Sequence, residues 1–96
     1  MAHYILIGNF TDQGIRAVRD TAKRAKAFKE AAKKQGVRVK ELYWTLGIYD
    51  LLITADAPND ETMAALSMKL GSLGNIKCQT LRAFGESEID SILSKV

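Results

Sequence analysis

Cysteine, proline, histidine and tryptophan each occur once among the 96 residues of this sequence. The lone Cys78 cannot form an intramolecular disulfide, and with His3 it supplies too few ligands for a structural zinc site. No apolar run approaches the roughly 20 residues that a membrane-spanning helix needs, and the first residues lack the features of a secretory signal. We therefore expect a cytoplasmic protein with no disulfide framework, no structural zinc and no membrane span.

The sequence also lacks the motifs by which many enzymes hold a cofactor or activate a nucleophile. It has no glycine-rich phosphate loop, no dinucleotide fingerprint, no zinc-protease motif and no nucleophile elbow. With 47% hydrophobic and 26% charged residues, the composition is that of an ordinary globular protein. We expect one compact domain over residues 1–96, without a metal and without a cofactor.

Positive charge is concentrated in one segment. Residues 12–35 hold eight basic and three acidic side chains, a net +5 within a whole-chain net charge of +3. This pattern is typical of a solvated helix face, and it would also attract an acidic partner. Nucleic-acid binding is not expected, because neither stacking aromatic residues nor a known reading motif accompanies the basic residues.

The hydrophobic pattern predicts four strands and three helices. Apolar residues three or four positions apart predict two long amphipathic helices. The first begins after Thr11. The second begins at Pro58, and its buried side extends to Leu73. The expected elements are strand 3–10, helix 12–35, strand 37–46, strand 48–55, helix 58–73, strand 76–84 and helix 86–96.

Gly47 is predicted to be the turn residue of a tight hairpin between the second and third strands. If the loop is Gly47 and Ile48, alternation of side chains fixes which residues share a face of the sheet. The register would then pair Trp44 with Leu51, Tyr43 with Leu52, and Glu41 with Thr54.

The order β-α-β-β-α-β with a short C-terminal helix predicts an α+β, ferredoxin-like domain with a four-stranded antiparallel sheet. Two amphipathic helices can cover only one face of that sheet. The other face would carry Tyr43 and Leu52, and monomers avoid leaving such apolar patches bare. We therefore expect a homodimer or a larger homo-oligomer, in which two sheets meet in an α/β-barrel-like interior.

The segment 43–50 contains Gly47, Tyr49 and Asp50, and it resembles the Gly-x-Tyr-Asp signature of the GYD domain family. Further similar blocks follow the family's order along nearly the whole chain, with asparagine at position 59 where the family usually has an acid. The resemblance implies a dimeric α/β-barrel fold and no particular reaction. The blocks are Thr-x-x-Gly-Ile at 11–15, an arginine at 24, Ala-Pro-Asn-Asp at 57–60, and the segments 73–76 and 80–84.

Five side chains are candidates for ligand binding: Tyr43, Tyr49, Asp50, Arg24 and Arg82. Asp50 suits a ligand anchor or a general base, and equally an acceptor of hydrogen bonds from turn N–H groups. Arg24 suits a bidentate contact with a carboxylate or a solvated helix face, and Arg82 needs an acidic partner or an anionic ligand if it points inward. Gly47 is expected to act only through the turn.

Three functions are compatible with these features. The preferred hypothesis is a self-associating module that binds a small ligand or regulates a partner, without catalytic activity. The second is a cofactor-light enzyme of the oxygenase or isomerase type, with a pocket formed by Tyr43, Tyr49, Asp50 and His3. The third is binding of an anionic partner by the basic first helix, with steep salt dependence.

Overall fold

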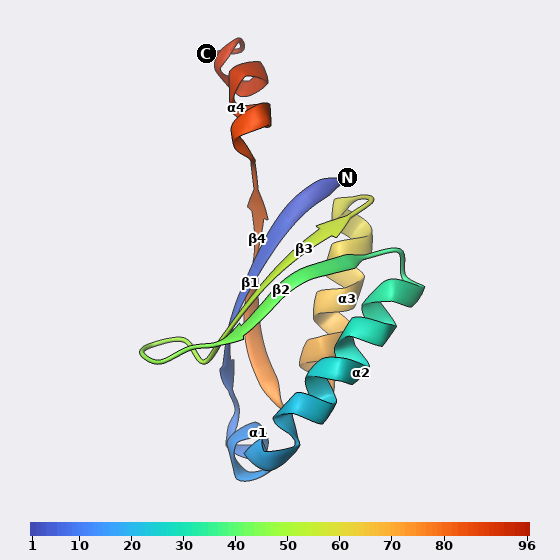
Figure 1. Cartoon of the computed structure of the whole chain (residues 1–96), viewed down its shortest axis with the longest axis vertical. Helices are drawn as coiled ribbons and strands as arrows, with labels where there is room; N and C mark the ends of the chain where they lie inside the picture. The colour runs from blue at the N-terminus through green and yellow to red at the C-terminus, as the bar shows by residue number, and fades with distance from the viewer.

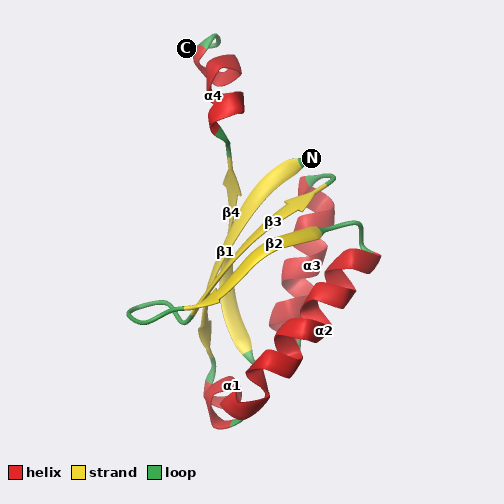
Figure 2. Cartoon of the chain, viewed as in Figure 1, coloured by secondary structure: helices red, strands yellow, loops and turns green.

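The computed structural model describes residues 1–96, and its strands and helices follow the predicted order. The elements are β1 (Ala2–Phe10), α1 (Asp12–Arg16), a 3-10 helix (Val18–Asp20), α2 (Thr21–Lys34), β2 (Arg38–Trp44), β3 (Leu51–Ala57), α3 (Asp60–Ser72), β4 (Ile76–Ala83) and α4 (Glu86–Leu93). The strands form one antiparallel sheet in the order β2-β3-β1-β4. Helices α2 and α3 pack on the same face of the sheet (Figures 1 and 2), so the fold is the predicted α+β, ferredoxin-like arrangement.

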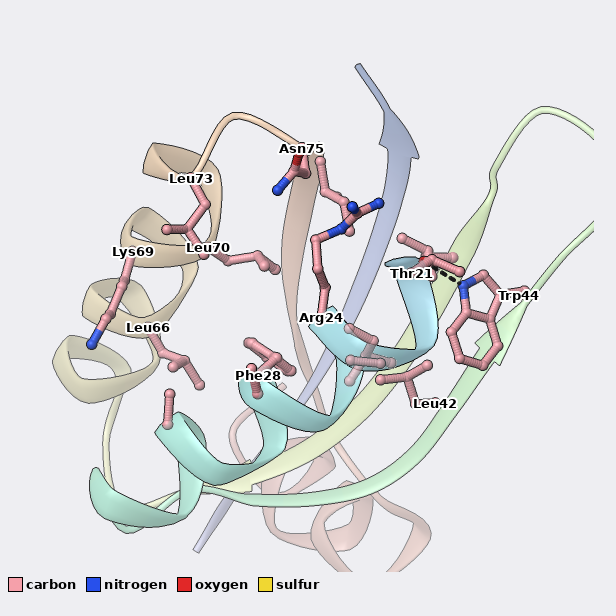
Figure 3. Close-up of a pocket in the computed structure, with 16 residues that line it drawn as sticks. Thr21, Arg24, Phe28, Leu42, Trp44, Leu66, Lys69, Leu70, Leu73 and Asn75 are labelled. Carbon is pink, nitrogen blue, oxygen red and sulfur yellow. Dashed lines mark hydrogen bonds between the residues drawn. The ribbon is translucent and has the colours of Figure 1, made fainter. Parts of the chain in front are cut away.

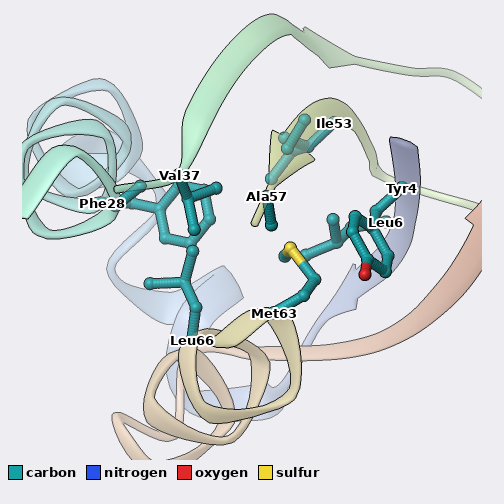
Figure 4. Packing of buried hydrophobic residues seen from close by; sticks show 10 residues of the cluster. Tyr4, Leu6, Phe28, Val37, Ile53, Ala57, Met63 and Leu66 are labelled. Atoms are coloured by element: carbon teal, nitrogen blue, oxygen red, sulfur yellow. The ribbon is translucent and has the colours of Figure 1, made fainter. Parts of the chain in front are cut away.

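The hydrophobic core lies between the sheet and the two long helices. Side chains alternate along a strand, so every second residue of β1 faces the helices. Tyr4 and Leu6 do so, and they are only 4% and 1% exposed. They share one buried cluster with Phe28 of α2 and with Met63 and Leu66 of α3 (Figure 4). This packing fixes both helices on one side of the sheet and leaves the intervening strand residues on the other.

The register predicted for the β2–β3 hairpin is confirmed. Tyr43 and Leu52 are opposite each other, as are the other two predicted pairs. Nothing in the amino-acid pattern indicated the irregularity between Val39 and Glu41, where the pairing shifts by one residue. Such a bulge bends an edge strand locally. Residues 41–44, which follow the bulge, remain in the predicted register and keep their predicted faces.

The predicted two-residue turn of this hairpin is wrong. The ladder stops at Trp44 and Leu51, and residues 45–50 form a longer loop. Beyond the ladder, the backbone N–H of Thr45 donates to the carbonyl of Asp50 at 2.8 Å, and the backbone N–H of Asp50 donates to the carbonyl of Gly8 on β1 at 2.9 Å. Gly47 does serve as a turn residue, since its φ of +119° lies in a region that side chains disfavour.

The single long helix expected after Thr11 is also wrong, because the chain breaks into α1, the 3-10 helix and α2. Thr11 caps α1 through its Oγ1, which accepts from the N–H of Gly14 at 3.0 Å. A Cβ atom on Gly14 would lie 1.9 Å from the carbonyl oxygen of Asn75, so α1 packs directly on the backbone before β4. The chain then turns to reach α2, and the apolar side chains of Ile15 and Val18 are 52% and 37% exposed.

The two remaining helices differ from the prediction only at their ends. Helix α3 is capped by Asn59, whose Oδ1 accepts from the N–H of Thr62 at 2.8 Å, so Pro58 precedes the cap. Leu73 follows the last turn and is 62% exposed. Helix α4 ends at Leu93 and projects beyond the end of the sheet (Figure 1). None of the helices combines the length and the apolar character that a membrane crossing requires.

Candidate functional site

One face of the sheet carries no helix of this chain (Figure 2). Its centre is apolar, because Leu52 of β3 pairs with Ile7 of β1, and Ile5 of β1 pairs with Leu81 of β4. Tyr43 of β2 lies beside Leu52 and is 50% exposed. We call these five residues the open face. They belong to the strand positions that alternate with the core positions, among which Thr54 opposite Ile5 and Gln79 opposite Ile7 are polar.

Tyr43 is held in place on the open face by a polar neighbour. Its hydroxyl donates to Glu41 Oε2 at 2.5 Å, and Thr54 Oγ1 donates to Glu41 Oε1 at 3.3 Å. The hydrogen bond to the Glu41 carboxylate raises the pKa of the Tyr43 phenol above its ordinary value, because it favours the protonated form. Tyr43 therefore presents an apolar ring and a protonated hydroxyl, which suits an interface more than acid–base chemistry.

Asp50 fastens the β2–β3 loop to the neighbouring strand β1. Its Oδ2 accepts from the backbone N–H of Phe10 at 3.0 Å and from Asn9 Nδ2 at 3.4 Å. Asn9 Nδ2 also donates to the carbonyl of Ile48, at 2.7 Å. Tyr49 follows in the same loop with its side chain partly exposed. The carboxylate of Asp50 thus accepts hydrogen bonds, but from residues of β1 and not from the turn N–H groups that one alternative named, and a role for Tyr49 and Asp50 in ligand binding stays a prediction.

A polar cluster lies at the opposite end of the sheet. His3 Nδ1 is 2.5 Å from Asp56 Oδ1, and His3 Nε2 is 3.3 Å from Glu88 Oε1. Lys40 Nζ adds a longer contact of 3.9 Å to Asp56 Oδ2. The two carboxylates contact opposite sides of the imidazole, and no group of His, Cys, Asp or Glu side chains in the structure is arranged to hold a metal ion. The cluster joins β1 and β3 to the first turn of α4.

Glu88 is the member of this cluster that belongs to α4. The backbone N–H of Gly85 donates to Glu88 Oε1 at 3.1 Å, an arrangement that caps the start of the helix. This hydrogen bond lowers the pKa of the Glu88 carboxyl, and the positive charges of His3 and Arg82 lower it further. Glu88 is therefore ionised near neutral pH and can hold α4 against the end of the sheet.

Arg82 is surrounded by partners from its own chain. Its guanidinium lies 4.4 Å from the ring centroid of Phe84 and 5.7 Å from that of Tyr4. Arg82 Nη2 is 3.7 Å from Glu88 Oε2, and Arg82 Nε is 3.9 Å from Asp60 Oδ1. Tyr4 donates its hydroxyl to the same Asp60, and burial followed by this hydrogen bond raises the pKa of the Tyr4 phenol. Arg82 thus links β4 to the starts of α3 and α4, and its role toward a ligand stays a prediction.

Arg24 lies on the helix-covered side of the sheet. Its Nη1 donates to the carbonyl of Ala17 at 3.0 Å, and its Nη2 donates to the carbonyl of Gly14 at 3.3 Å. These carbonyls belong to the end of α1, where backbone acceptors lack partners within the helix. Arg24 therefore fastens α2 to α1, on the opposite side of the sheet from Tyr43.

The five predicted binding residues do not converge on one pocket. Tyr43 belongs to the open face, Arg24 and Arg82 contact groups elsewhere, and Tyr49 and Asp50 lie in the hairpin loop. The enzyme hypothesis joined Tyr43 to His3, which lies along β1 about 13 Å from the row of residues that holds Tyr43. His3 therefore does not join the other three residues within one chain, and a pocket formed by Tyr43, Tyr49 and Asp50 stays a prediction.

The cluster of His3, Asp56 and Glu88 was missed by sequence reasoning. The third strand was expected to end at Ala55, so Asp56 was placed outside the sheet, although it pairs with His3 across β1 and β3. Extending that strand by the alternation of its side chains would have found this pair. Glu88 carried no such signal, because its position depends on how the chain turns between β4 and α4.

Comparisons with known proteins agree with this architecture. The family model described as the GYD domain matches residues 4–93, nearly the whole chain. The chain is also 29% identical, over 90 residues, to a protein of Thermus thermophilus named "Glutamine synthetase and cystathionine beta-lyase binding protein". This match covers 93% of the present chain and 95% of the Thermus protein. The name of that relative describes the binding of two enzymes and no reaction.

Proposed function

Because this chain belongs to the GYD domain family, we propose that it is a self-associating binding module without catalytic activity. Two copies form a homodimer by covering each other's open face, and the dimer binds and regulates a protein partner. Glutamine synthetase and cystathionine beta-lyase are the first candidates for that partner, since the Thermus relative carries both in its name. The observation that carries the proposal is the open face itself.

The open face supports self-association through its composition. Leu52, Ile5 and Ile7 form its centre, while Tyr43 and Leu81 at its margins are 50% and 40% exposed. Burial of apolar surface contributes roughly 25 cal/mol per Å², so covering these side chains stabilises the covered state. A second copy is a suitable cover, because it brings an identical apolar face of the same size and shape.

Helix α4 supports the same conclusion. It projects beyond the sheet and away from α2 and α3 (Figure 1), and Ile89 and Leu93 are 43% and 57% exposed on it. Phe84, just before this helix, is 56% exposed. An amphipathic helix is stabilised when its apolar side is covered. We propose that α4 lies against the partner copy, held in that direction by the ion pairs of Glu88.

The loop 45–50 is a second apolar projection. The side chains of Leu46 and Ile48 are 103% and 82% exposed at its tip, so they make almost no contact within this chain. The loop extends on the side of the sheet opposite to α2 and α3 (Figure 1), which is the side that a second copy would occupy. The hydrogen bonds of Asp50 to β1 keep the loop in this position. We propose that the loop packs against the edge of the partner's sheet.

In such a dimer α2 remains on the outer surface. Its lysines at positions 23, 26, 29 and 33 are exposed and three or four residues apart, so they follow one side of the helix. A row of cations favours a partner with an acidic surface and accelerates its association. We propose that this lysine row contacts the partner enzyme. The basic residues of the first long helix then form the surface that binds the partner.

The partner part of the proposal is tested by measuring binding of the purified chain to glutamine synthetase and to cystathionine beta-lyase of the same organism, over a series of salt concentrations. The triple variant Lys23→Gln, Lys26→Gln and Lys29→Gln should weaken binding about tenfold and flatten its salt dependence. A matched control removes the same charge elsewhere, from three exposed lysines outside α2: Lys69→Gln, Lys77→Gln and Lys95→Gln.

The control variant should bind nearly as well as the unmodified chain. Equal losses in the two triple variants would reject the lysine row as the contact surface, because they would reflect net charge alone. Absence of binding to both enzymes at low salt would reject these two proteins as partners.

A further inference from the structure

A cavity of about 270 Å³ opens between α2, α3 and the sheet (Figure 3). Its walls are largely apolar and include Phe28 of α2, Leu42 and Trp44 of β2, and Leu66 and Leu70 of α3. The cavity lies on the helix-covered side of the sheet, so it is separate from the open face. A second copy covering the open face would leave it accessible.

This cavity is larger than the gaps that ordinary packing leaves. Protein interiors are packed about as densely as organic crystals, and a dry engineered cavity of roughly 150 Å³ is already large enough to bind benzene. The cavity between α2 and α3 therefore has room for an apolar group larger than benzene. Trp44, 46% exposed, lies at one side of it, where its Nε1 donates to Thr21 Oγ1 at 3.0 Å.

Arg24 brings a positive charge to the wall of this cavity. Its two Nη atoms are occupied by the carbonyls of Ala17 and Gly14, but its Nε is buried without any hydrogen-bond partner. In Figure 3 the Arg24 side chain extends along the cavity toward Asn75. No acidic side chain lines the cavity. A cation in an apolar wall without a carboxylate beside it is costly, and an anionic ligand would relieve that cost.

We propose that the cavity binds an amphipathic monocarboxylate. The carboxylate pairs with the positive charge of the Arg24 guanidinium, and the apolar body lies between Phe28, Trp44 and Leu70. Arg24 keeps its bonds to α1, so an occupied cavity joins α1, α2 and α3 more firmly. This site needs neither self-association nor an enzyme partner, and its test is independent of both.

Octanoate is a suitable probe, and octanol is its uncharged counterpart. The only tryptophan of the chain borders the cavity, so its fluorescence reports binding directly. Octanoate should change the Trp44 emission saturably, and octanol should bind about tenfold more weakly because it lacks the negative charge. A linear, unsaturable response to octanoate, or equal affinities of the two probes, would overturn the proposal.

Two variants on α2 separate the cavity from non-specific binding. Ala31 lines the cavity and Ala22 does not, so Ala31→Phe should abolish octanoate binding while Ala22→Phe should preserve it. Equal behaviour of these two variants would count against the cavity as the site. Arg24→Gln should lower octanoate affinity about tenfold and leave octanol affinity unchanged, because only the carboxylate uses the guanidinium. If Arg24→Gln does not fold, the comparison of octanoate with octanol on the unmodified chain still decides.

Discussion

Replacing Gly14 by alanine tests how α1 is held against the start of β4. A Cβ atom at this position would lie 1.9 Å from the carbonyl oxygen of Asn75 and 2.8 Å from its carbonyl carbon. Both are backbone atoms, so no change of rotamer relieves the overlap. Either α1 or the segment before β4 has to move.

That movement disrupts the hydrogen bonds that join the two segments. The backbone N–H of Thr11 donates to the Asn75 carbonyl at 3.1 Å, and Thr11 Oγ1 donates to the Gly74 carbonyl at 2.5 Å. Gln13 Nε2 donates to the Leu73 carbonyl at 3.1 Å. At about 1 kcal/mol for each bond, the loss of all three costs about 3 kcal/mol. Alanine returns up to about 1 kcal/mol through its helix propensity, so the free energy of unfolding should fall by about 2 kcal/mol.

Gly71→Ala is the matched control for this substitution. Gly71 is exposed in α3, and a Cβ atom there would meet nothing within 4 Å. This change should raise the free energy of unfolding by about 0.5–1 kcal/mol. Both variants are unfolded with urea at one protein concentration and followed by circular dichroism. A Gly14→Ala protein as stable as the unmodified chain, or a shift of both variants in one direction, would refute the reasoning.

Three further predictions concern single residues. Asn59→Ala should lower the free energy of unfolding by about 1 kcal/mol through loss of the cap of α3, and an unchanged urea midpoint would contradict that role. The N–H of Gly85, aided by His3, holds the pKa of Glu88 in the folded state below the ordinary 4.5. The ionised Glu88 carboxylate therefore stabilises the fold above that pH, and this stabilisation is lost as the pH falls through the lowered pKa. Acid should therefore release α4 from the sheet in the unmodified chain, and Glu88→Gln should reduce this effect of pH, as followed by NMR. The same dependence of α4 on pH in the unmodified chain and in the variant would contradict this. Burial raises the pKa of the Cys78 thiol, so a thiol reagent should modify it more slowly in the native than in the urea-unfolded chain; equal rates would contradict it.

The fold was predictable because its signals are local and periodic. Strands with alternating apolar residues, amphipathic helices and the turn at Gly47 together specify the β-α-β-β-α-β order. Alternation also placed Tyr43 opposite Leu52 correctly, because a slip of one residue would exchange the faces of a whole strand. The open face followed from the same pattern.

Features that depend on distant contacts were not predictable in this way. The close approach of α1 to the backbone of Asn75 at Gly14 is one such contact, which no helical periodicity encodes. The length of the hairpin loop depends on hydrogen bonds from Asp50 to β1, and the position of Arg24 depends on the carbonyls of α1. Each of these contacts joins residues that only the finished fold brings together.

The molecular mass in dilute solution tests the central claim most directly, and sedimentation equilibrium measures it. We expect twice the 10.6 kDa of one chain, with Leu52→Lys reducing the mass to that of a single chain because it places a charge at the centre of the open face. Met68→Lys, a change at a residue 74% exposed on α3, should leave the mass doubled. A single-chain mass for the unmodified protein at micromolar concentration would contradict the proposal that a second copy covers the open face.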